Sequence, residues 1–222
     1  MSHKSPWVMI KGIIFDLFGT IIYEMREKQR FVEFAELIGK DWNDYNYRKL
    51  YEVYFASRKI PNFREPTIAL LKTLNIPYNE ELINKLVSVL NDFTPQSFRM
   101  YDDAKSVLYV LKNKYKLALL TNVTSPVFDA VWQRFKLENI FDGIVCSFQI
   151  NTVKPDKRAF TAALNAINLT RDNVIYVGDS FKEDIRGAEN FGMIAVLIDR
   201  EGKHPQYENR IERLHELRRF LA

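Results

Sequence analysis

Four groups of polar residues stand at or beyond the ends of short apolar runs that lie far apart in the sequence. Such runs are typical of strands that are buried on both faces of a parallel sheet. These strands bring their last residues to the carboxyl edge of the sheet, where α/β proteins place their ligands. The four groups are Asp16 with Thr20, Thr121 with Asn122, Lys154, and Asp179 with Asp184. We therefore expect three carboxylates, a lysine and a hydroxyl to share one pocket.

These residue types suit a hard cation and an anionic substrate. Carboxylates that lie close together raise one another's pKa unless a cation neutralises them. Mg²⁺ takes oxygen ligands and is typically bound by one or two carboxylates together with water and phosphate. Lys154 would add positive charge against an anionic substrate or transition state. The expected cofactor is therefore Mg²⁺, and the expected partner is a small anionic molecule.

An alternation of strand and helix patterns must position these residues. After the run that ends at Asp16, strand patterns return at 117–120, 141–147, 174–177 and 194–198. Helical patterns lie between them, one of which is expected to begin with Ser125 as its cap and Pro126 at its first position. A last amphipathic helix is expected over 211–221. Alternating strands and helices require right-handed parallel crossovers, so the predicted fold class is α/β with a doubly wound, Rossmann-like parallel sheet.

The segment from Tyr23 to Pro95 departs from this alternation. Apolar residues recur there at helical spacing, and prolines separate the periodic stretches. We interpret the segment as about four inserted helices whose aromatic residues form a core of their own. The predicted organisation is a core domain made of residues 7–22 and 96–222, with an all-helical domain at 23–95.

Composition narrows the class of protein. The net charge of +4 over 222 residues is too small to indicate a nucleic-acid partner. No apolar run approaches the roughly 20 residues of a membrane helix, and Met1 to Pro6 is expected to be a disordered lead-in without the apolar segment of a signal peptide. The single cysteine, Cys146, cannot form an internal disulfide, which favours a reducing, cytoplasmic compartment. We expect a monomer or a homodimer.

Taken in order, the motifs resemble those of the haloacid dehalogenase superfamily of aspartate-nucleophile hydrolases. The matching stretches are DLFGT at 16–20, TN at 121–122, KPD at 154–156 and GDSFKED at 178–184. Their order, spacing and strand context agree with the family over about residues 10–198. The inserted helical segment is similar to the family's small C1-type cap domain, and we call it the cap.

The resemblance implies a role for each matched residue. Asp16 would be the nucleophile and would form a covalent intermediate that water then hydrolyses. Thr121 would hydrogen-bond the transferring group, and Lys154 would hold both that group and the Asp16 carboxylate. The residues implied to contact the substrate are Gly19, Thr20, Asn122 and Arg48.

The implied metal site contains Asp16, Asp179 and the main-chain carbonyl of Phe18. Asp184 would bind the Mg²⁺ ion directly or stand just behind its ligands. Phosphoryl transfer suits such a site because its catalysis is mostly positioning and charge neutralisation.

Phe18 departs from the family pattern of phosphatases, which usually carry a second aspartate there as general acid and base. A phenyl ring cannot transfer a proton, and such transfer is worth roughly 10²–10⁴-fold in rate. An aromatic residue at this position resembles the 2-haloacid dehalogenases, whose halide leaving group needs no proton. Arg48 also lies about where those enzymes place the arginine that receives halide or carboxylate.

Asp179 argues against a dehalogenase, because the dehalogenases resemble one another in having serine there and in needing no metal. They also tend to have tyrosine where this chain has Phe160. An acidic pair of Asp179 and Asp184 implies a cation, and a cation implies phosphate. We therefore favour a Mg²⁺-dependent phosphatase for a small, activated phosphorylated metabolite. The alternatives are a 2-haloacid dehalogenase, and a catalytically weakened binding or regulatory protein on the same fold.

The cap would select the substrate. Its basic residues expected to face the site are Arg26, Arg48 and Lys59. The family implies that the cap opens and closes over the pocket about hinges near 21–23 and 95–100.

Overall fold

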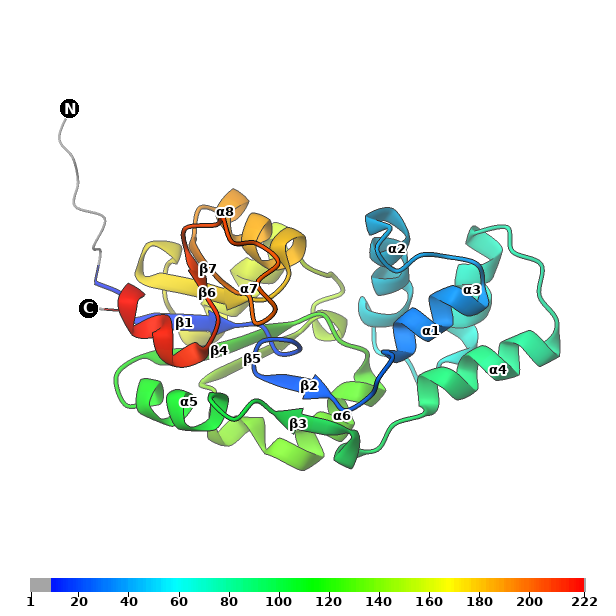
Figure 1. The fold of residues 1–222 in the computed structure, drawn as a ribbon, viewed down its shortest axis with the longest axis horizontal. Coiled ribbons are helices and arrows are strands. Elements are labelled where there is room, and N and C mark those ends of the chain that lie inside the picture. The colour runs from blue at the N-terminus through cyan, green and yellow to red at the C-terminus, as the bar shows by residue number, and fades with distance from the viewer. Residues whose placement is uncertain (1–8, 222) are drawn as a thin grey trace.

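A six-stranded sheet with parallel pairing throughout forms the centre of the molecule, in the order β5-β4-β1-β6-β7-β8. The structure is a computed structural model and describes residues 9–221, so the expected lead-in at 1–6 lies outside the described residues. The strands are β1 (Gly12–Phe15), β4 (Lys116–Thr121), β5 (Gly143–Cys146), β6 (Val174–Gly178), β7 (Ile194–Ile198) and β8 (Arg210–Ile211). Figure 1 shows β1 running through the middle of this sheet.

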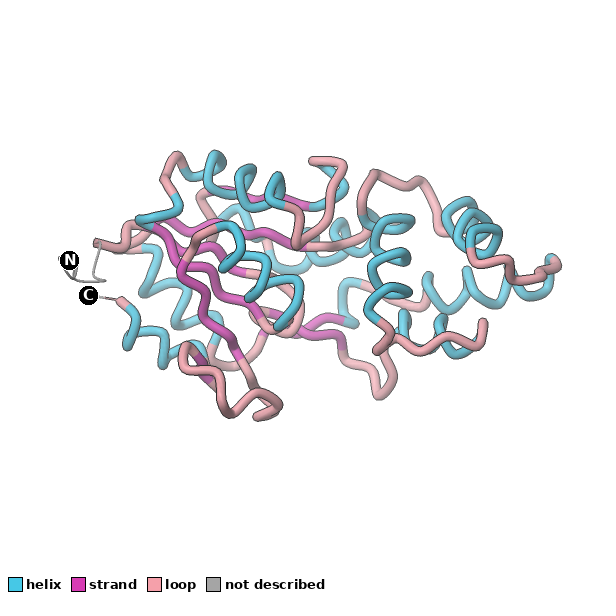
Figure 2. Tube along the Cα trace, turned by 90° about the horizontal axis from the view of Figure 1, so that it is seen from above, coloured by secondary structure: helices cyan, strands magenta, loops and turns pink. Residues whose placement is uncertain are grey.

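Both faces of the sheet are buried because side chains alternate along each strand. In β1, Ile13 and Phe15 join one apolar cluster and Ile14 joins the other. Helices α7 (Lys157–Ile167) and α8 (Arg186–Phe191) pack on the Ile14 face. Helices α5 (Ala104–Lys112) and α6 (Ser125–Phe135) contribute to the opposite cluster, so helices cover both faces of the sheet (Figure 2). The predicted doubly wound α/β fold is confirmed.

The inserted segment contains four α-helices, as expected. They are α1 (Arg30–Leu37), α2 (Tyr45–Ala56), α3 (Arg64–Thr73) and α4 (Glu80–Asn91). Aromatic rings fill the space between them: Tyr51 stacks on Phe55 at 4.4 Å between ring centroids, and Phe34 meets Tyr51 edge-on at 5.6 Å. The aromatic-rich pattern therefore does mark the apolar interior of the cap.

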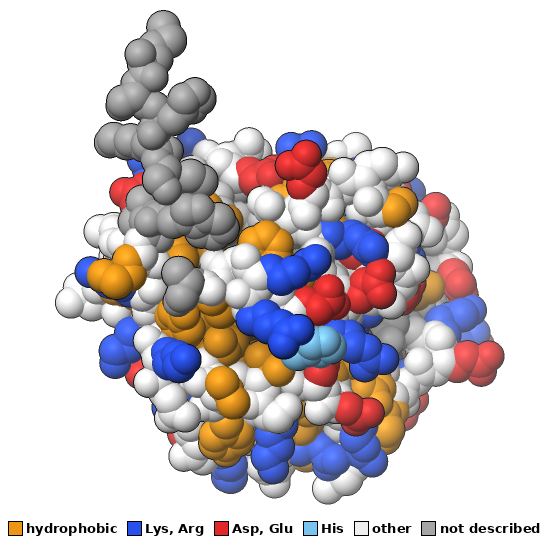
Figure 3. Space-filling view, turned by 60° about the vertical axis from the view of Figure 1, so that its left-hand side comes forward, with side chains coloured by type: hydrophobic (Ala, Val, Ile, Leu, Met, Phe, Trp, Pro, Cys, Tyr) orange, Lys and Arg blue, Asp and Glu red, His pale blue; other side chains and the backbone are white. Residues whose placement is uncertain are grey.

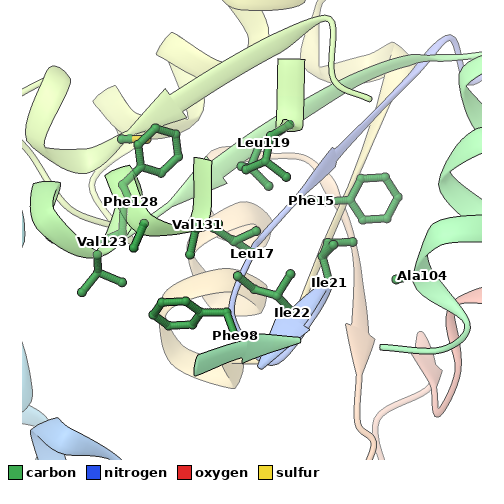
Figure 4. Close-up of a cluster of buried hydrophobic side chains, with 14 of the residues drawn as sticks. Phe15, Leu17, Ile21, Ile22, Phe98, Ala104, Leu119, Val123, Phe128 and Val131 are labelled. Atoms are coloured by element: carbon green, nitrogen blue, oxygen red, sulfur yellow. The ribbon is translucent and has the colours of Figure 1, made fainter. Parts of the chain in front are cut away.

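A short antiparallel ribbon lies where the chain enters and leaves the cap. It pairs β2 (Ile22–Glu24) with β3 (Phe98–Met100). Figure 4 shows Ile22 and Phe98 from this ribbon beside Leu17 in the buried cluster. This cluster continues from the sheet into the cap, so the division into domains at 22/23 and 95/96 stays a prediction.

The expected helix over 211–221 is wrong. Ile211 belongs to β8, and Leu214–Phe220 forms a 3₁₀-helix. The apolar residues Ile211, Leu214, Leu217 and Phe220 recur every third position, which is the repeat of a 3₁₀-helix rather than the 3.6 residues of an α-helix.

Ser125 is not the helix cap that its sequence position suggests. Thr124 precedes the first turn of α6, and Ser125 is the first residue of that helix. The Ser125 hydroxyl instead accepts from the Ile60 N–H at 3.0 Å and donates to the Ile60 carbonyl at 3.1 Å. The Ser125 hydroxyl thus bonds to the cap segment instead of capping its own helix.

Charged side chains are mixed on the molecular face in Figure 3, where basic and acidic groups lie next to one another. This mixture agrees with the small net charge of +4. Among residues 9–221, none of the helices is both long enough and apolar enough to span a bilayer.

Candidate active site

The sheet order places three predicted site residues on adjacent strands. Asp16 follows β1, Thr121 ends β4 and Asp179 follows β6, and β1 pairs with both β4 and β6. The Asp16 N–H donates to the carbonyl of Val177 at 2.8 Å, which continues the β1–β6 pairing by one residue. Residues more than 100 positions apart therefore meet at one sheet edge.

Lys154 reaches this edge from the segment between β5 and α7. Its Nζ lies 2.6 Å from Asp16 Oδ1 and 2.7 Å from Asp184 Oδ1, and it also contacts the Tyr176 hydroxyl at 3.1 Å. Burial alone would lower the pKa of Lys154, but the two carboxylates raise it well above its ordinary value. Lys154 is therefore a fixed positive charge in the site.

The three carboxylates are close enough to share one cation. Oxygen atoms of Asp16, Asp179 and Asp184 lie within 4.8 Å of one another. Burial raises the pKa of Asp16 to about 6 despite the opposing charge of Lys154. Asp179 is exposed to the cavity, where partial desolvation and the charges of Asp16 and Asp184 raise its pKa well above its ordinary value. When all three carboxylates are ionised, the one lysine leaves two negative charges in excess, so the donor set fits a divalent cation.

Two glycines allow these carboxylates to approach the backbone. Gly19 has a φ of +77°, and a Cβ there would collide with the carboxylate of Asp179. A Cβ at Gly178 would collide with the side chain of Asp184. The glycines of two predicted motifs thus provide space for acidic side chains.

Asp184 lies on a single π-helical turn, Phe181–Ile185, which precedes α8. Its Oδ1 accepts from the Tyr176 hydroxyl at 2.7 Å, and its Oδ2 accepts from the Ser180 N–H at 3.0 Å. These bonds, together with Lys154, fix the orientation of the Asp184 carboxylate. Such turns are frequent at functional sites because they redirect a side chain within a helix.

A cavity of about 420 Å³ lies over the carboxylates, between the sheet edge and the cap. Its floor on the core side is mostly polar and includes Asp16, Phe18, Gly19, Thr121, Asn122, Lys154, Asp179 and Asp184. Cap side chains form its apolar wall, among them Phe31, Trp42, Tyr51, Phe63 and Leu90. The hydroxyls of Thr121 and Thr20 are buried and have no hydrogen-bond partner among the described residues. Thr121 lines the cavity, so its hydroxyl can bind a ligand oxygen there, whereas Thr20 is not part of the lining.

Arg48 lines the same cavity but is not free. Its Nη2 lies 2.7 Å from Glu183 Oε1, and this ion pair joins cap helix α2 to the π-helical turn. Lys49 also crosses to the core, where its Nζ donates to the Lys154 carbonyl at 3.0 Å. The cap is thus docked on the core by charged contacts that surround the cavity.

The other two basic cap candidates do not face the cavity. Arg26 pairs with Glu33 at 2.8 Å and with Asp92 at 2.7 Å on the cap surface. Lys59 is exposed and does not contribute to the cavity lining. The expectation for Arg26 and Lys59 is wrong. Arg26 lies in the loop before α1 and Lys59 in the loop between α2 and α3, and the local sequence does not fix where a loop side chain points.

Several residues around the cavity were not predicted. Glu52 lies one helical turn after Arg48 on α2, a spacing that places both on one helix face and could have indicated it. Arg30 and Glu24 form a buried ion pair at 2.7 Å in the cap wall. Tyr176 precedes Gly178 by two residues, but its apolar neighbours in β6 give no sign of its contact with Lys154.

An open parallel sheet with carboxylates and a lysine at its carboxyl edge, below a ligand-sized cavity, has the architecture of an α/β enzyme for small molecules. The family model of haloacid dehalogenase-like hydrolases matches residues 13–198. The chain belongs to this hydrolase family, which confirms the resemblance seen in the motifs.

Relatives with different activities match nearly the whole chain. It is 25% identical to (S)-2-haloacid dehalogenase 4A of Burkholderia cepacia, over 96% of this chain and 95% of that protein. It is 27% identical to the glyceraldehyde 3-phosphate phosphatase of Methanopyrus kandleri, over 91% and 89% respectively. The magnesium-bound HAD-hydrolase YfnB of Bacillus subtilis has the same fold, with a TM-score of 0.63, 18% identity, and coverage of 96% and 99%. Family membership therefore leaves both phosphate-ester and 2-haloacid substrates open.

Proposed function

We propose that this chain is a Mg²⁺-dependent phosphatase that acts through Asp16 on a small, activated phosphorylated metabolite. The observation that carries this proposal is the cluster of Asp16, Asp179 and Asp184 around one lysine. The two excess negative charges of the ionised cluster would repel an anionic substrate in a metal-free reaction. They fit a site that a divalent cation completes.

Each site residue has its own role in phosphoryl transfer. Lys154 holds Oδ1 of Asp16, which leaves the other carboxylate oxygen to attack phosphorus. The bond from phosphorus to the leaving group breaks as the bond to Asp16 forms, and water later hydrolyses the acyl phosphate. The unpartnered Thr121 hydroxyl donates to an oxygen of the transferring group. Mg²⁺ held by Asp16, Asp179 and the Phe18 carbonyl, with Asp184 at or beside it, would neutralise the charge of that group.

Phe18 supports an activated substrate. Its ring packs against Phe98 of the ribbon, with centroids 5.9 Å apart, and offers no proton to a leaving group. Acyl phosphates, phosphoanhydrides and labile phosphoesters leave most readily without strong acid assistance. Cys146 is buried and unpaired, which favours a cytoplasmic protein, and we propose a monomer or homodimer without a nucleic-acid or membrane partner.

A second candidate is 2-haloacid dehalogenation. Phe18 and Arg48 both line the cavity, and a dehalogenase is among the relatives that match nearly the full chain. In this reaction Arg48 would have to leave Glu183 in order to receive the halide or carboxylate. We rank it second because it gives no role to Asp179.

One set of assays separates these candidates. Phosphate release from acetyl phosphate and p-nitrophenyl phosphate is measured with and without Mg²⁺, alongside chloride release from 2-chloropropionate. We expect Mg²⁺-dependent phosphate release and no chloride, and Asp16→Asn should lower kcat by more than about 10³-fold. Chloride release without metal would replace the proposal by the dehalogenase. No turnover of any of these substrates would favour a binding or regulatory protein.

A further inference from the structure

Glu52 places a cap carboxyl beside the site residues of the core. It lies on α2 and lines the cavity that Asp16 and Thr121 also line. Its Oε2 accepts a hydrogen bond from Asn122 Nδ2 at 3.1 Å. Asn122 directly follows Thr121, so Glu52 stands next to the residue that we propose contacts the transferring group.

The Asn122 side chain is itself fixed by hydrogen bonds to the main chain of Lys154. Its Oδ1 accepts from the Lys154 N–H at 2.8 Å, and its Nδ2 also donates to the Lys154 carbonyl at 3.3 Å. The amide therefore connects three segments: the end of β4, the segment that carries Lys154, and the cap. With the cap docked, Glu52 is fixed relative to the proposed nucleophile.

The charges around Glu52 are already engaged with other groups. Lys154 is paired with Asp16 and Asp184, Arg48 with Glu183, and Lys49 with a main-chain carbonyl. Among the described residues, no ion pair includes Glu52.

Burial and the charge of Glu183 raise the pKa of Glu52 to about 7, against the lowering by Lys49, Lys154 and Arg48. Glu52 can therefore be protonated or ionised near neutral pH, which is the range that general acid catalysis requires.

Because Phe18 leaves the core without a proton donor two residues after Asp16, we propose that Glu52 supplies it from the cap, protonating the leaving group. This inference rests on the proposed phosphatase function. It extends the substrates from activated phosphates to esters of poorer leaving groups.

The proton and electron changes balance over two steps. When Asp16 bonds to phosphorus, the electron pair of the breaking P–O bond goes to the leaving oxygen, which takes the proton of Glu52 and departs as an alcohol or phenol. Water then attacks phosphorus, the Asp16–phosphorus bond breaks, and the Glu52 carboxylate takes the proton of that water. Phosphate leaves, and both carboxyl groups return to their starting forms.

The test is Glu52→Gln on a series of aryl phosphates whose phenols span a wide range of acidity. Gln has the same shape and can still accept from Asn122, but it cannot donate an acidic proton. We expect kcat/KM with Mg²⁺ to fall less than about 3-fold for p-nitrophenyl phosphate and about 10²-fold or more for phenyl phosphate. The dependence of rate on leaving-group acidity should thus be steeper in the variant. Glu81→Gln, an exposed substitution on cap helix α4, should keep the wild-type dependence.

Equal losses on all esters would mean that Glu52 only positions the substrate, and would overturn the assignment. If Glu52→Gln does not fold, Glu52→Asp is used. Its kcat/KM must depend more steeply on leaving-group acidity than that of the wild type, because the acid is set back by one methylene. Lack of phosphate release by the wild-type protein overturns the proposed function and this inference with it. If the wild type releases phosphate and the two proteins depend equally on leaving-group acidity, only the role of Glu52 is overturned.

Discussion

Lys154 Nζ lies 2.6 Å from Asp16 Oδ1, although the two residues are 138 positions apart in the sequence. The same ammonium group lies 2.7 Å from Asp184 Oδ1. One buried ammonium group therefore separates two buried carboxylates. It also fixes Oδ1 of Asp16, which is the oxygen of the proposed nucleophile that does not attack phosphorus.

Removing this cation should destabilise the fold. Lys154→Met leaves Asp16 and Asp184 buried without their partner, which costs about 3–5 kcal/mol of the free energy of unfolding in metal-free buffer at neutral pH. The loss should be smaller at pH 5, because Asp16, whose pKa is about 6, is then largely protonated and no longer needs the charge of Lys154. Urea unfolding measures both values. Lys116→Met breaks an exposed pair with Asp142 and should cost less than about 1 kcal/mol. A comparable loss in the two variants would contradict the structural role of Lys154.

Gly19 should be needed for the position of Asp179 and not only for its own backbone conformation. Gly39 also has a positive φ, +65°, but a Cβ there meets nothing within 4 Å. Gly39→Ala should therefore cost about 1–2 kcal/mol for the left-handed conformation alone. Gly19→Ala should cost more and should weaken Mg²⁺ binding in calorimetry. If both variants lose the same stability and Gly19→Ala binds Mg²⁺ normally, the contact with Asp179 does not matter.

Mg²⁺ should stabilise the folded protein, because the carboxylate cluster exists only when the sheet is formed. At a concentration of 100 times Kd, the gain is about 2.7 kcal/mol. For a chain of this size it should raise Tm by about 5–10 °C in thermal unfolding. Asp179→Asn should lose this rise, whereas Asp172→Asn at an exposed site should keep it. A rise that survives in Asp179→Asn would place the bound ion elsewhere.

Ser125 should contribute to the docking of the cap. Its hydroxyl satisfies both the N–H and the carbonyl of Ile60, so Ser125→Ala leaves buried main-chain groups unpaired. We expect a loss of about 1–3 kcal/mol in urea unfolding. Ser106→Ala, which alters an exposed serine of α5, serves as the control and should lie within about 0.5 kcal/mol of wild type. A neutral Ser125→Ala would show that water replaces the hydroxyl.

Asp199 should make stability sensitive to acid. It follows β7, accepts from the N–H groups of Lys203 and His204 at 2.8 Å each, and pairs with Arg210. Burial alone would raise the pKa of Asp199, but these contacts lower it below its ordinary value. A pKa that is lower in the folded state adds stability above the unfolded value of about 3.9, and this stability is lost as the pH falls through the folded value.

The free energy of unfolding should therefore fall more steeply below pH 4 in the wild type than in Asp199→Asn. Chemical denaturation between pH 3 and pH 6 measures the two slopes, with Asp172→Asn as an exposed carboxylate control. Identical slopes in the wild type and Asp199→Asn would assign the acid sensitivity to other carboxylates.

The sequence by itself determined the sheet and what stands at its edge. A short run of consecutive apolar residues predicts a strand that is buried on both faces of a parallel sheet, and Asp16, Thr121 and Asp179 follow from where such strands end. The four cap helices and their aromatic interior were likewise predictable, because helical periodicity is a local property of the chain. The same local reasoning fails at 211–221, where the apolar residues follow the three-residue repeat of a 3₁₀-helix rather than the repeat of an α-helix.

Only the tertiary structure decided how the cap meets this edge. The contacts of Glu52 with Asn122, Arg48 with Glu183 and Ser125 with Ile60 join residues 70, 135 and 65 positions apart. Helical periodicity shows which residues share a face, but not how that face is rotated against another segment. Packing between the cap and the core sets this rotation and brings Glu52 to the cavity beside Asn122. Arg26 and Lys59 lie in loops outside the helices, and neither lines the cavity.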